Sequence, residues 1–254
     1  MKISVFTKGK LPNRNEDALA YDQTSFVVCD GSTGKSKALF DGKTGGELAS
    51  SLVARAALES RLNGKDLISY LTQLLREKKI EISNSESEVD IETTLVCARM
   101  ADSKLIVTQV ADTAFRINGN EVFENRAIID IIMSQARATY IKLTDDIDGG
   151  RDYIMPLLLN ERKYINNANS PAGLGVLNGQ TIPSKYIKTF EFNLAGLKTL
   201  EIYTDGYSAI PLEVSIDAYE TAHAKVQQTD PHKYLQYAST KSNDDRTVLI
   251  VDFS

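Results

Sequence analysis

Acidic residues stand at the ends of short apolar runs throughout this sequence. Three aspartates follow such runs directly, and two acidic pairs directly precede them. These residues are Asp30, Asp112 and Asp205 after a run, and Glu16-Asp17 and Asp244-Asp245 before one. A single aspartate of this kind is typical of a turn residue that hydrogen-bonds its own backbone. Five separate cases favour a shared role, because a carboxylate at the end of a buried strand is costly without a cation or hydrogen-bond donors.

Carboxylates that converge in space repel one another, and a divalent cation supplies the counter-charge. Oxygen ligands without His or Cys nearby favour Mg²⁺ or Mn²⁺ over Zn²⁺. Two such ions that share a carboxylate can lower the pKa of a shared water molecule and clamp a phosphoryl oxygen. If the five acidic sites meet, their residue types therefore predict the hydrolysis of a phosphate ester.

The elements that would position these residues form two batches of strands, with helices gathered between them. The strands are expected over 3–7, 17–21, 25–29, 93–98, 104–110, 113–117, 186–192, 199–204 and 247–253. Apolar periodicity predicts helices that begin at Gly45 and near Asp66, and helical stretches over 128–143, 153–164 and about 215–239. Residues 148–150 are expected to form a turn. This order favours α+β layers over regular βαβ alternation.

The composition is that of an ordinary globular protein. The chain has 254 residues, 42% of them hydrophobic and 25% charged, which suits one domain over 1–254. No apolar run reaches the roughly 20 residues of a membrane span, and residues 1–4 lack the apolar stretch of a signal peptide. Cys29 and Cys97 lie in apolar runs, as small core residues do in a reducing compartment, so a cytoplasmic location is expected. The net charge of −5 argues against a nucleic-acid partner.

Seven short motifs, taken in order, resemble those of the PPM (type 2C) metal-dependent serine/threonine protein phosphatases, as bacterial-type members carry them. The motifs are Asn15-Glu16-Asp17, Asp30-Gly31, Gly46-Glu47-Leu48-Ala49-Ser50, Thr93-Thr94, Ala111-Asp112-Thr113, Thr204-Asp205-Gly206 and Asp244-Asp245-Arg246-Thr247-Val248. They extend from residue 15 to residue 248 and so cover nearly the whole chain. The resemblance implies a four-layer α-β-β-α sandwich, in which helices flank two antiparallel sheets and the metals lie at one end of the sheets.

The resemblance also implies roles for the matching residues. Asp30 would bridge two ions, either Mn²⁺ or Mg²⁺. Glu16 and the Gly31 carbonyl would complete the first metal site, and Asp205 and Asp244 would complete the second. The nucleophile would be water or hydroxide between the metals. The implied activity is hydrolysis of phosphoserine and phosphothreonine in a phosphorylated protein, carried out by a monomer.

Three further expectations come from the same resemblance. Asp17 would accept hydrogen bonds behind the metal ligands. Asp112 would match the aspartate of a weaker third metal site, and with Asp30 and Asp205 it would make up the catalytic aspartates. The segment 143–178 would be the flap beside the site, where substrate choice is partly set.

Two departures from the family pattern bear on the substrate more than on metal binding. The phosphate-binding arginine of the family usually lies four residues before the metal-binding glutamate, a position that is Pro12 here. Arg14 is the nearest substitute for this phosphate contact, and an ordinary loop charge explains it equally well. Residues 32–34 read Ser-Thr-Gly in place of a common His-Ala-Gly, so the general acid is unassigned. A small phosphorylated metabolite also fits as substrate.

Two other interpretations stay open. Residues 29–36 nearly fit the phosphate-binding loop G-x-x-x-x-G-K-[ST] of nucleotide-binding proteins, with Cys29 in place of the first glycine. That loop must lead straight into a helix, whereas residues 41–46 intervene and Asp30 would place a negative charge in the phosphate cradle. The other alternative is a catalytically weak phosphatase-like module that binds a phosphorylated partner and needs no two-metal site.

Overall fold

The computed structural model describes residues 1–32, 38–83 and 89–254. The strands in these ranges are β1 (Lys2–Lys8), β2 (Ala18–Tyr21), β3 (Ser25–Cys29), β4 (Leu95–Ala101), β5 (Lys104–Val110), β6 (Ala114–Ile117), β7 (Glu121–Phe123), β8 (Lys188–Asn193), β9 (Thr199–Tyr203) and β10 (Arg246–Asp252). The helices are α1 (Gly45–Ser60), α2 (Gly64–Ile82), α3 (Ile128–Thr144), α4 (Gly149–Asn160) and α5 (Ile216–Thr229), with short 3-10 helices at Glu161–Lys163, Ser184–Tyr186 and Leu194–Gly196.

The strands form two five-stranded sheets in which every pairing is antiparallel. One sheet has the order β1-β10-β9-β6-β7, and the other has the order β2-β3-β4-β5-β8. The two sheets pack face to face around an apolar core. Strand β3 is buried along its whole length because its side chains alternate between two cores. Phe26 and Val28 enter the core between the sheets, whereas Val27 and Cys29 face α1 and α2.

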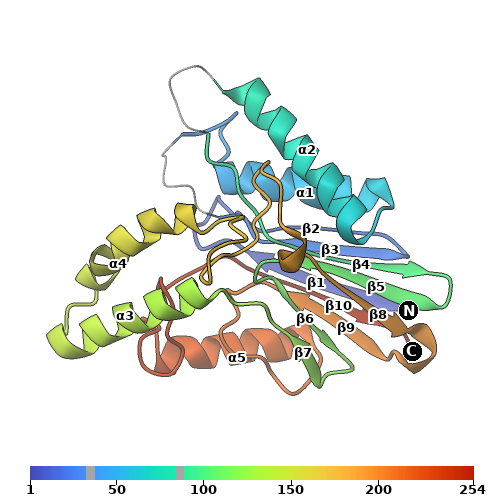
Figure 1. Ribbon diagram of the computed structural model, residues 1–254. Coiled ribbons are helices and arrows are strands. Elements are labelled where there is room, and N and C mark those ends of the chain that lie inside the picture. The colour runs from blue at the N-terminus through green and yellow to red at the C-terminus, as the bar shows by residue number, and fades with distance from the viewer. Residues whose placement is uncertain (33–37, 84–88) are drawn as a thin grey trace.

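The helices complete the layers. In Figure 1, α1 and α2 cover the outer face of the β2–β8 sheet, and α5 lies on the outside of the other sheet. Tyr219 of α5 is fully buried there against Tyr203 and Val248. These layers confirm the predicted α-β-β-α sandwich. Helices α3 and α4 form a pair beside one end of the sandwich, with a small core of their own.

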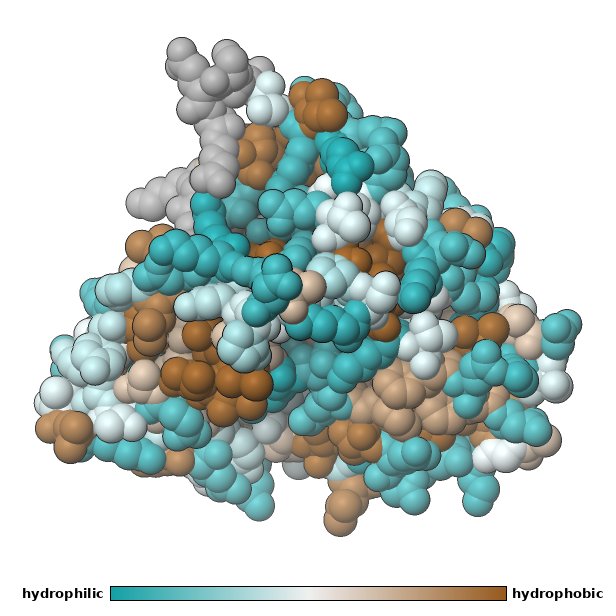
Figure 2. Space-filling view, viewed as in Figure 1, coloured by the Kyte–Doolittle hydropathy of each residue, from teal (hydrophilic) through white to brown (hydrophobic). Residues whose placement is uncertain are grey.

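The α3–α4 pair also carries exposed apolar side chains. Figure 2 shows apolar residues gathered over this pair. The α3–α4 apolar patch consists of Ile128, Ile131, Ile132, Tyr153 and Leu157, each between 40% and 58% exposed. Because monomeric soluble proteins rarely leave large contiguous apolar surfaces uncovered, such a patch points to a contact surface.

Most predicted elements are confirmed to within a few residues, but two expectations are wrong and one strand was not predicted. The helical region expected over 215–239 ends at Thr229, because the Asp230 carboxylate accepts four successive backbone N–H groups, those of residues 234–237, and folds this stretch into a loop. Helix α4 begins at Gly149, where the sequence predicts a turn, because Asp146 Oδ1 accepts the Gly149 N–H at 2.8 Å. Strand β7 is too short to show a periodic pattern.

Among the described residues, no helix is both long enough and apolar enough to cross a membrane. Cys29 and Cys97 are buried free thiols in the core beneath α1 and α2. This placement confirms that both cysteines are core residues.

Candidate active site

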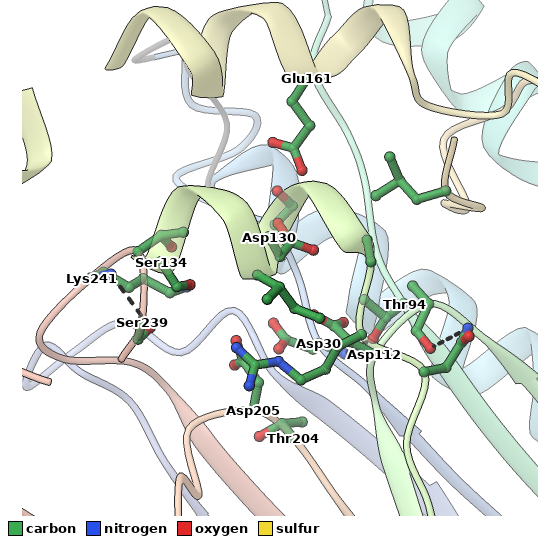
Figure 3. Close-up of a pocket in the computed structure, with 18 of the residues that line it drawn as sticks. Asp30, Thr94, Asp112, Asp130, Ser134, Glu161, Thr204, Asp205, Ser239 and Lys241 are labelled. Carbon is green, nitrogen blue, oxygen red and sulfur yellow. Dashed lines mark hydrogen bonds between the residues drawn. The ribbon is translucent and has the colours of Figure 1, made fainter. Parts of the chain in front are cut away.

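All five acidic sites meet at one end of the sandwich. The antiparallel registers explain why, because β2 begins beside the end of β3, and β4 begins beside the ends of β3 and β5. In the other sheet, β10 begins beside the end of β9. Residues that follow or precede these strand ends therefore share one edge of the fold. Figure 3 shows Asp30, Asp112 and Asp205 together at this edge.

The position of Asp30 is fixed through its backbone. Its N–H donates to Thr94 Oγ1 at 3.1 Å, and its carbonyl accepts from Thr93 Oγ1 at 2.8 Å and from the Thr94 N–H at 2.9 Å. Since the main-chain groups are occupied in this way, the Asp30 carboxylate is left to face the cleft, where it is among the lining groups. The Thr93-Thr94 motif therefore serves to orient Asp30.

The loop that carries Glu16 is held by Asp245. The two oxygens of the Asp245 carboxylate accept the Lys10 N–H at 2.7 Å and the Glu16 N–H at 3.3 Å. Asp245 is only 2% exposed, and such buried charge-assisted bonds are stronger than neutral ones. The second aspartate of the Asp244-Asp245 pair thus acts as an anchor for the N-terminal loop, next to the predicted ligand Asp244.

Gly31 brings this loop and α1 into contact. Its N–H donates to the Glu16 carbonyl at 3.0 Å. A Cβ at position 31 would lie 2.4 Å from that carbonyl oxygen and 2.5 Å from the carbonyl oxygen of Gly46. Only glycine fits here, because both obstacles are backbone atoms.

Gly31→Ala is therefore expected to lower the free energy of unfolding by about 2 kcal/mol or more, since overpacking against backbone cannot be relieved by a rotamer change. Urea denaturation of the metal-free protein measures this loss. Gly196→Ala is the matched control, because a Cβ at position 196 has no atom within 4 Å. An equal loss in both variants would contradict the packing explanation.

Asp17 is buried behind the other carboxylates. Its Oδ2 accepts from Thr204 Oγ1 at 2.8 Å, and its Oδ1 is buried with no hydrogen-bond partner in the part of the chain that the structure describes. Burial raises the pKa of Asp17 from 3.8 to about 8, and the charges of Asp244 and Asp245 add to the effect. The ionised form of a carboxyl group buried in this way is stable only beside a positive charge.

Burial, and then the charges of neighbouring acids, also raise the pKa values of other carboxyl groups in this cluster. Burial raises the pKa of Asp30 well above its usual range, and the charges of Asp17, Asp205 and Asp244 raise it further. Burial, followed by the charge of Asp205, raises the pKa of Asp244 to about 6. Burial raises the pKa of Asp112 as well. The cluster is therefore short of positive charge.

These shifts predict how stability changes with pH in the metal-free protein. Because the folded-state pKa of Asp17 lies near 8 and its ordinary value is 3.8, the native state binds the extra proton between these limits. Asp17 alone should then make the free energy of unfolding fall by on the order of 3 kcal/mol as pH rises from 5 to 7, at about 1.4 kcal/mol per pH unit. Urea denaturation in EDTA at several pH values measures this slope.

Asp17→Asn should reduce the slope by about 1.4 kcal/mol per pH unit, because asparagine has no proton to lose while Asp30 and Asp130 keep their raised pKa values. Asp217→Asn, at an exposed aspartate in the first turn of α5, is the control and should keep it. Stability that rises with pH over this range in the unmutated protein would contradict the prediction.

Two lysines lie among the acids, and sequence reasoning missed both because a loop lysine has no periodic or motif signal. Lys10 Nζ lies 2.9 Å from Glu16 Oε2 and 3.3 Å from Asp245 Oδ2. Lys241 Nζ forms an ion pair with Asp244 Oδ2. The charges of the neighbouring acids outweigh the effect of burial and raise the pKa of both ammonium groups.

The donor set fits Mg²⁺ or Mn²⁺ in kind. The side chains that converge are carboxylates, and one buried carboxylate oxygen, Asp17 Oδ1, has no hydrogen-bond partner among the described residues. Within residues 1–32, 38–83 and 89–254, however, no three Asp, Glu, His or Cys side chains stand in an arrangement that would by itself hold a metal ion. With Lys10 and Lys241 paired to the acids, a divalent cation would have to replace an ammonium group as counter-charge.

Three of these acids open onto a cleft of about 840 Å³. Asp30, Asp112 and Asp205 line one side, and Asp130 and Glu161 approach from the α3–α4 side (Figure 3). Burial, then the charges of Asp112 and Glu161, raises the pKa of Asp130 to about 8. Sequence reasoning missed Asp130 because an acid in the first turn of a helix is ordinary. The cleft is larger than a phosphate group needs and leaves room for flanking parts of a substrate.

The loop that carries Lys241 and Asp244 is clamped from α3. The Arg137 side chain is 2% exposed, and its Nη1 donates to three backbone carbonyls, those of residues 232, 233 and 239, at 3.0–3.2 Å. Its Nη2 donates to Ser242 Oγ at 2.9 Å. Arg151 of α4 donates to the Thr240 carbonyl at 2.8 Å. The α3–α4 pair therefore sets the position of this loop.

The remaining expectations concern Arg14, the Ser-Thr-Gly departure and the phosphate-binding-loop match. Arg14 is not among the described residues that line the cleft, so its contact with phosphate stays a prediction; Lys10 of the same loop does line it. Residues 33–37, which include two residues of the Ser-Thr-Gly departure and half of the phosphate-binding-loop match, lie outside the described residues. Helix α1 begins only at Gly45, with its N-terminus capped by Thr44, whose Oγ1 accepts the Glu47 N–H.

Solved structures with the same fold include bacterial phosphatases. The chain is 19% identical to the serine/threonine phosphatase Stp1 from Staphylococcus aureus, with 99% of this chain and 94% of that chain covered and a TM-score of 0.55. It is 18% identical to the Mycobacterium tuberculosis serine/threonine phosphatase PstP/Ppp, with 99% and 97% covered and a TM-score of 0.53. The catalytic domain of PstP in complex with two manganese ions is 16% identical, with the same coverage and TM-score.

No protein-family model matches the sequence, and no curated protein matches it. The likeness to the solved structures shows that this chain has the fold of the bacterial serine/threonine phosphatases. The fold expected from the PPM-type motifs is thereby confirmed.

Proposed function

We propose that this chain is a metal-dependent phosphatase that hydrolyses phosphoserine and phosphothreonine esters in proteins, with residues 1–254 as one catalytic domain. One observation carries the proposal. Acidic residues from both sheets, Asp30, Asp112 and Asp205, line a single cleft at one end of a fold shared with serine/threonine phosphatases. Glu16 and Asp244 lie beside them, where both approach Lys10 and where the charge of Asp244 raises the pKa of Asp30.

The proposed metal sites use these residues. Asp30, Glu16 and the Gly31 carbonyl would hold one ion, Asp205 and Asp244 would hold a second, and Asp112 would hold a weaker third. When bound, Mn²⁺ or Mg²⁺ supplies a Lewis acid that activates water and neutralises phosphate charge. The two manganese ions in the PstP structure support Mn²⁺ as the first ion to test.

The residues behind the ligands keep the site ready for the reaction. Thr93 and Thr94 hold the Asp30 backbone, and Asp245 holds the loop that carries Glu16. Asp17 accepts a hydrogen bond from Thr204 behind them. Such fixed positions lower the reorganisation that catalysis requires.

Three features support a protein substrate. The cleft is large, the α3–α4 apolar patch reaches it through Ile128 and Ile131, and the proposed flap over 143–178 supplies part of its lining, including Leu158 and Leu174. Apolar lining beside a polar centre suits the residues that flank a phosphorylated side chain. The proposal includes a monomer in the cytoplasm, with a phosphorylated protein as partner and no role for nucleic acid or membrane.

The test compares p-nitrophenyl phosphate, a phosphoserine peptide and a small sugar phosphate, each with Mn²⁺, Mg²⁺ or EDTA. We expect turnover only with a divalent cation, and a kcat/KM for the peptide at least about ten-fold above that for the sugar phosphate. If protein shown to be folded gives no turnover with any metal, the proposed phosphatase activity is contradicted. That result would favour the alternative, a module that binds a phosphorylated partner and needs no two-metal site. The ion pair between Lys241 and Asp244 is compatible with that alternative, because it gives Asp244 a counter-charge without a metal.

A further inference from the structure

Both carboxylate oxygens of Asp244 are occupied within the protein. Its Oδ1 accepts the Asp245 N–H at 3.0 Å, and its Oδ2 is paired with Lys241 Nζ. Asp244 is only 5% exposed, so solvent screens this pair little. A divalent cation that uses Asp244 Oδ2 as a ligand must therefore displace the ammonium group of Lys241.

Lys241 is placed to move between two partners. Its backbone lies in the loop clamped by Asp230 and Arg137, whereas its side chain lines the cleft and is 30% exposed. The ammonium group also interacts with the charges of Asp205 and Asp30, so it faces the acids that would hold both ions. A lysine carries its charge on a flexible stem of four carbons and can change partner while its backbone stays in place.

The phosphate group of a substrate needs a positive partner in this cleft. Pro12 stands where the resembling family has its phosphate-binding arginine, and Arg14 is not among the described residues that line the cleft. Once divalent cations satisfy the acids, the Lys241 ammonium group loses its carboxylate partner beside the place where phosphate would bind. Lysine is a common partner for phosphate, as a compact point charge.

We propose that Lys241 is an exchangeable counter-ion, which occupies Asp244 in the metal-free protein and, when a divalent cation displaces it, binds the phosphate group of the substrate. The inference rests on the proposed function and deepens it. It assigns to one side chain both a competition with the metal and a contact with the substrate.

The test is calorimetric titration of Mn²⁺ into EDTA-treated, dialysed protein, followed by titration of inorganic phosphate into the Mn²⁺-loaded protein. Lys241→Met should bind Mn²⁺ about ten-fold more tightly than the unmutated protein, because the ammonium group paired with Asp244 Oδ2 is gone, and should bind phosphate about ten-fold more weakly. Lys241→Arg should stay close to the unmutated protein in both titrations, because it keeps the charge.

Lys142→Met is the control, since Lys142 lines the same cleft from the last turn of α3. This control should leave Mn²⁺ affinity unchanged. If both Met variants gain Mn²⁺ affinity equally, the gain comes from the loss of any positive charge near the cleft, and the inference is overturned. Mn²⁺ affinity in Lys241→Met that is unchanged or lower, or phosphate affinity that is unchanged, would also overturn it. If the folded, unmutated protein binds no Mn²⁺, the proposed function itself fails, which is a separate result.

Discussion

Replacing Asp30 or Asp205 by asparagine is expected to lower metal-dependent kcat/KM for p-nitrophenyl phosphate by about a thousand-fold or more. Each change keeps the shape of the side chain and removes a charge that the proposed metal sites require. Loss of one preorganised electrostatic group commonly costs two to three orders of magnitude in rate, and loss of a metal ligand also lowers the occupancy of the ion. The measurement is the initial rate over a Mn²⁺ series, so that weakened binding and slowed chemistry are separated.

Folding must be shown to survive in both variants. Asp30 lies in a cluster with too little positive charge, so Asp30→Asn relieves repulsion in the metal-free state and should raise the free energy of unfolding. Asp217→Asn is the matched control, because Asp217 is exposed on α5 and should leave the rate unchanged. Retention of more than about a tenth of the activity in Asp30→Asn would contradict a bridging role for this residue.

Arg137→Met is expected to lower the free energy of unfolding by about 3–5 kcal/mol, the largest stability effect we anticipate. The guanidinium group donates to three carbonyls and one hydroxyl of the loop that carries Lys241 and Asp244. Methionine fills similar space and leaves those acceptors without their donor. Urea denaturation of the metal-free protein measures the loss.

The same variant should bind Mn²⁺ more weakly, because Asp244 would no longer be held at a fixed distance from Asp205. Arg137→Lys separates charge from geometry, since an ammonium group cannot reproduce a planar fork that reaches several acceptors. We expect Arg137→Lys to recover only part of the stability. A loss below about 1 kcal/mol in Arg137→Met would show that water replaces the guanidinium at little cost.

Much of the fold could be predicted from the sequence because its signals are local. Short runs of β-branched and other apolar residues mark β1, β3 and β5, and an apolar stripe marks α1 and α2. The resemblance to PPM-type motifs supplied the sheet arrangement, which periodicity by itself does not contain. The end of α5 was beyond sequence reasoning, since one carboxylate, Asp230, organises the loop after Thr229 through its own hydrogen bonds.

The candidate site also has one part that the sequence predicts and another that only the tertiary structure shows. The sequence alone determined which acids stand at strand ends, because the apolar run and the acid that ends it are neighbours in the chain. Only the tertiary structure decided that Lys10 and Lys241 pair with those acids and that Asp130 joins them from α3. The two sheets place the N-terminal loop and the loop before β10 together, although more than two hundred residues separate them. The charge balance of this cluster depends on that distant pairing, and no local pattern encodes it.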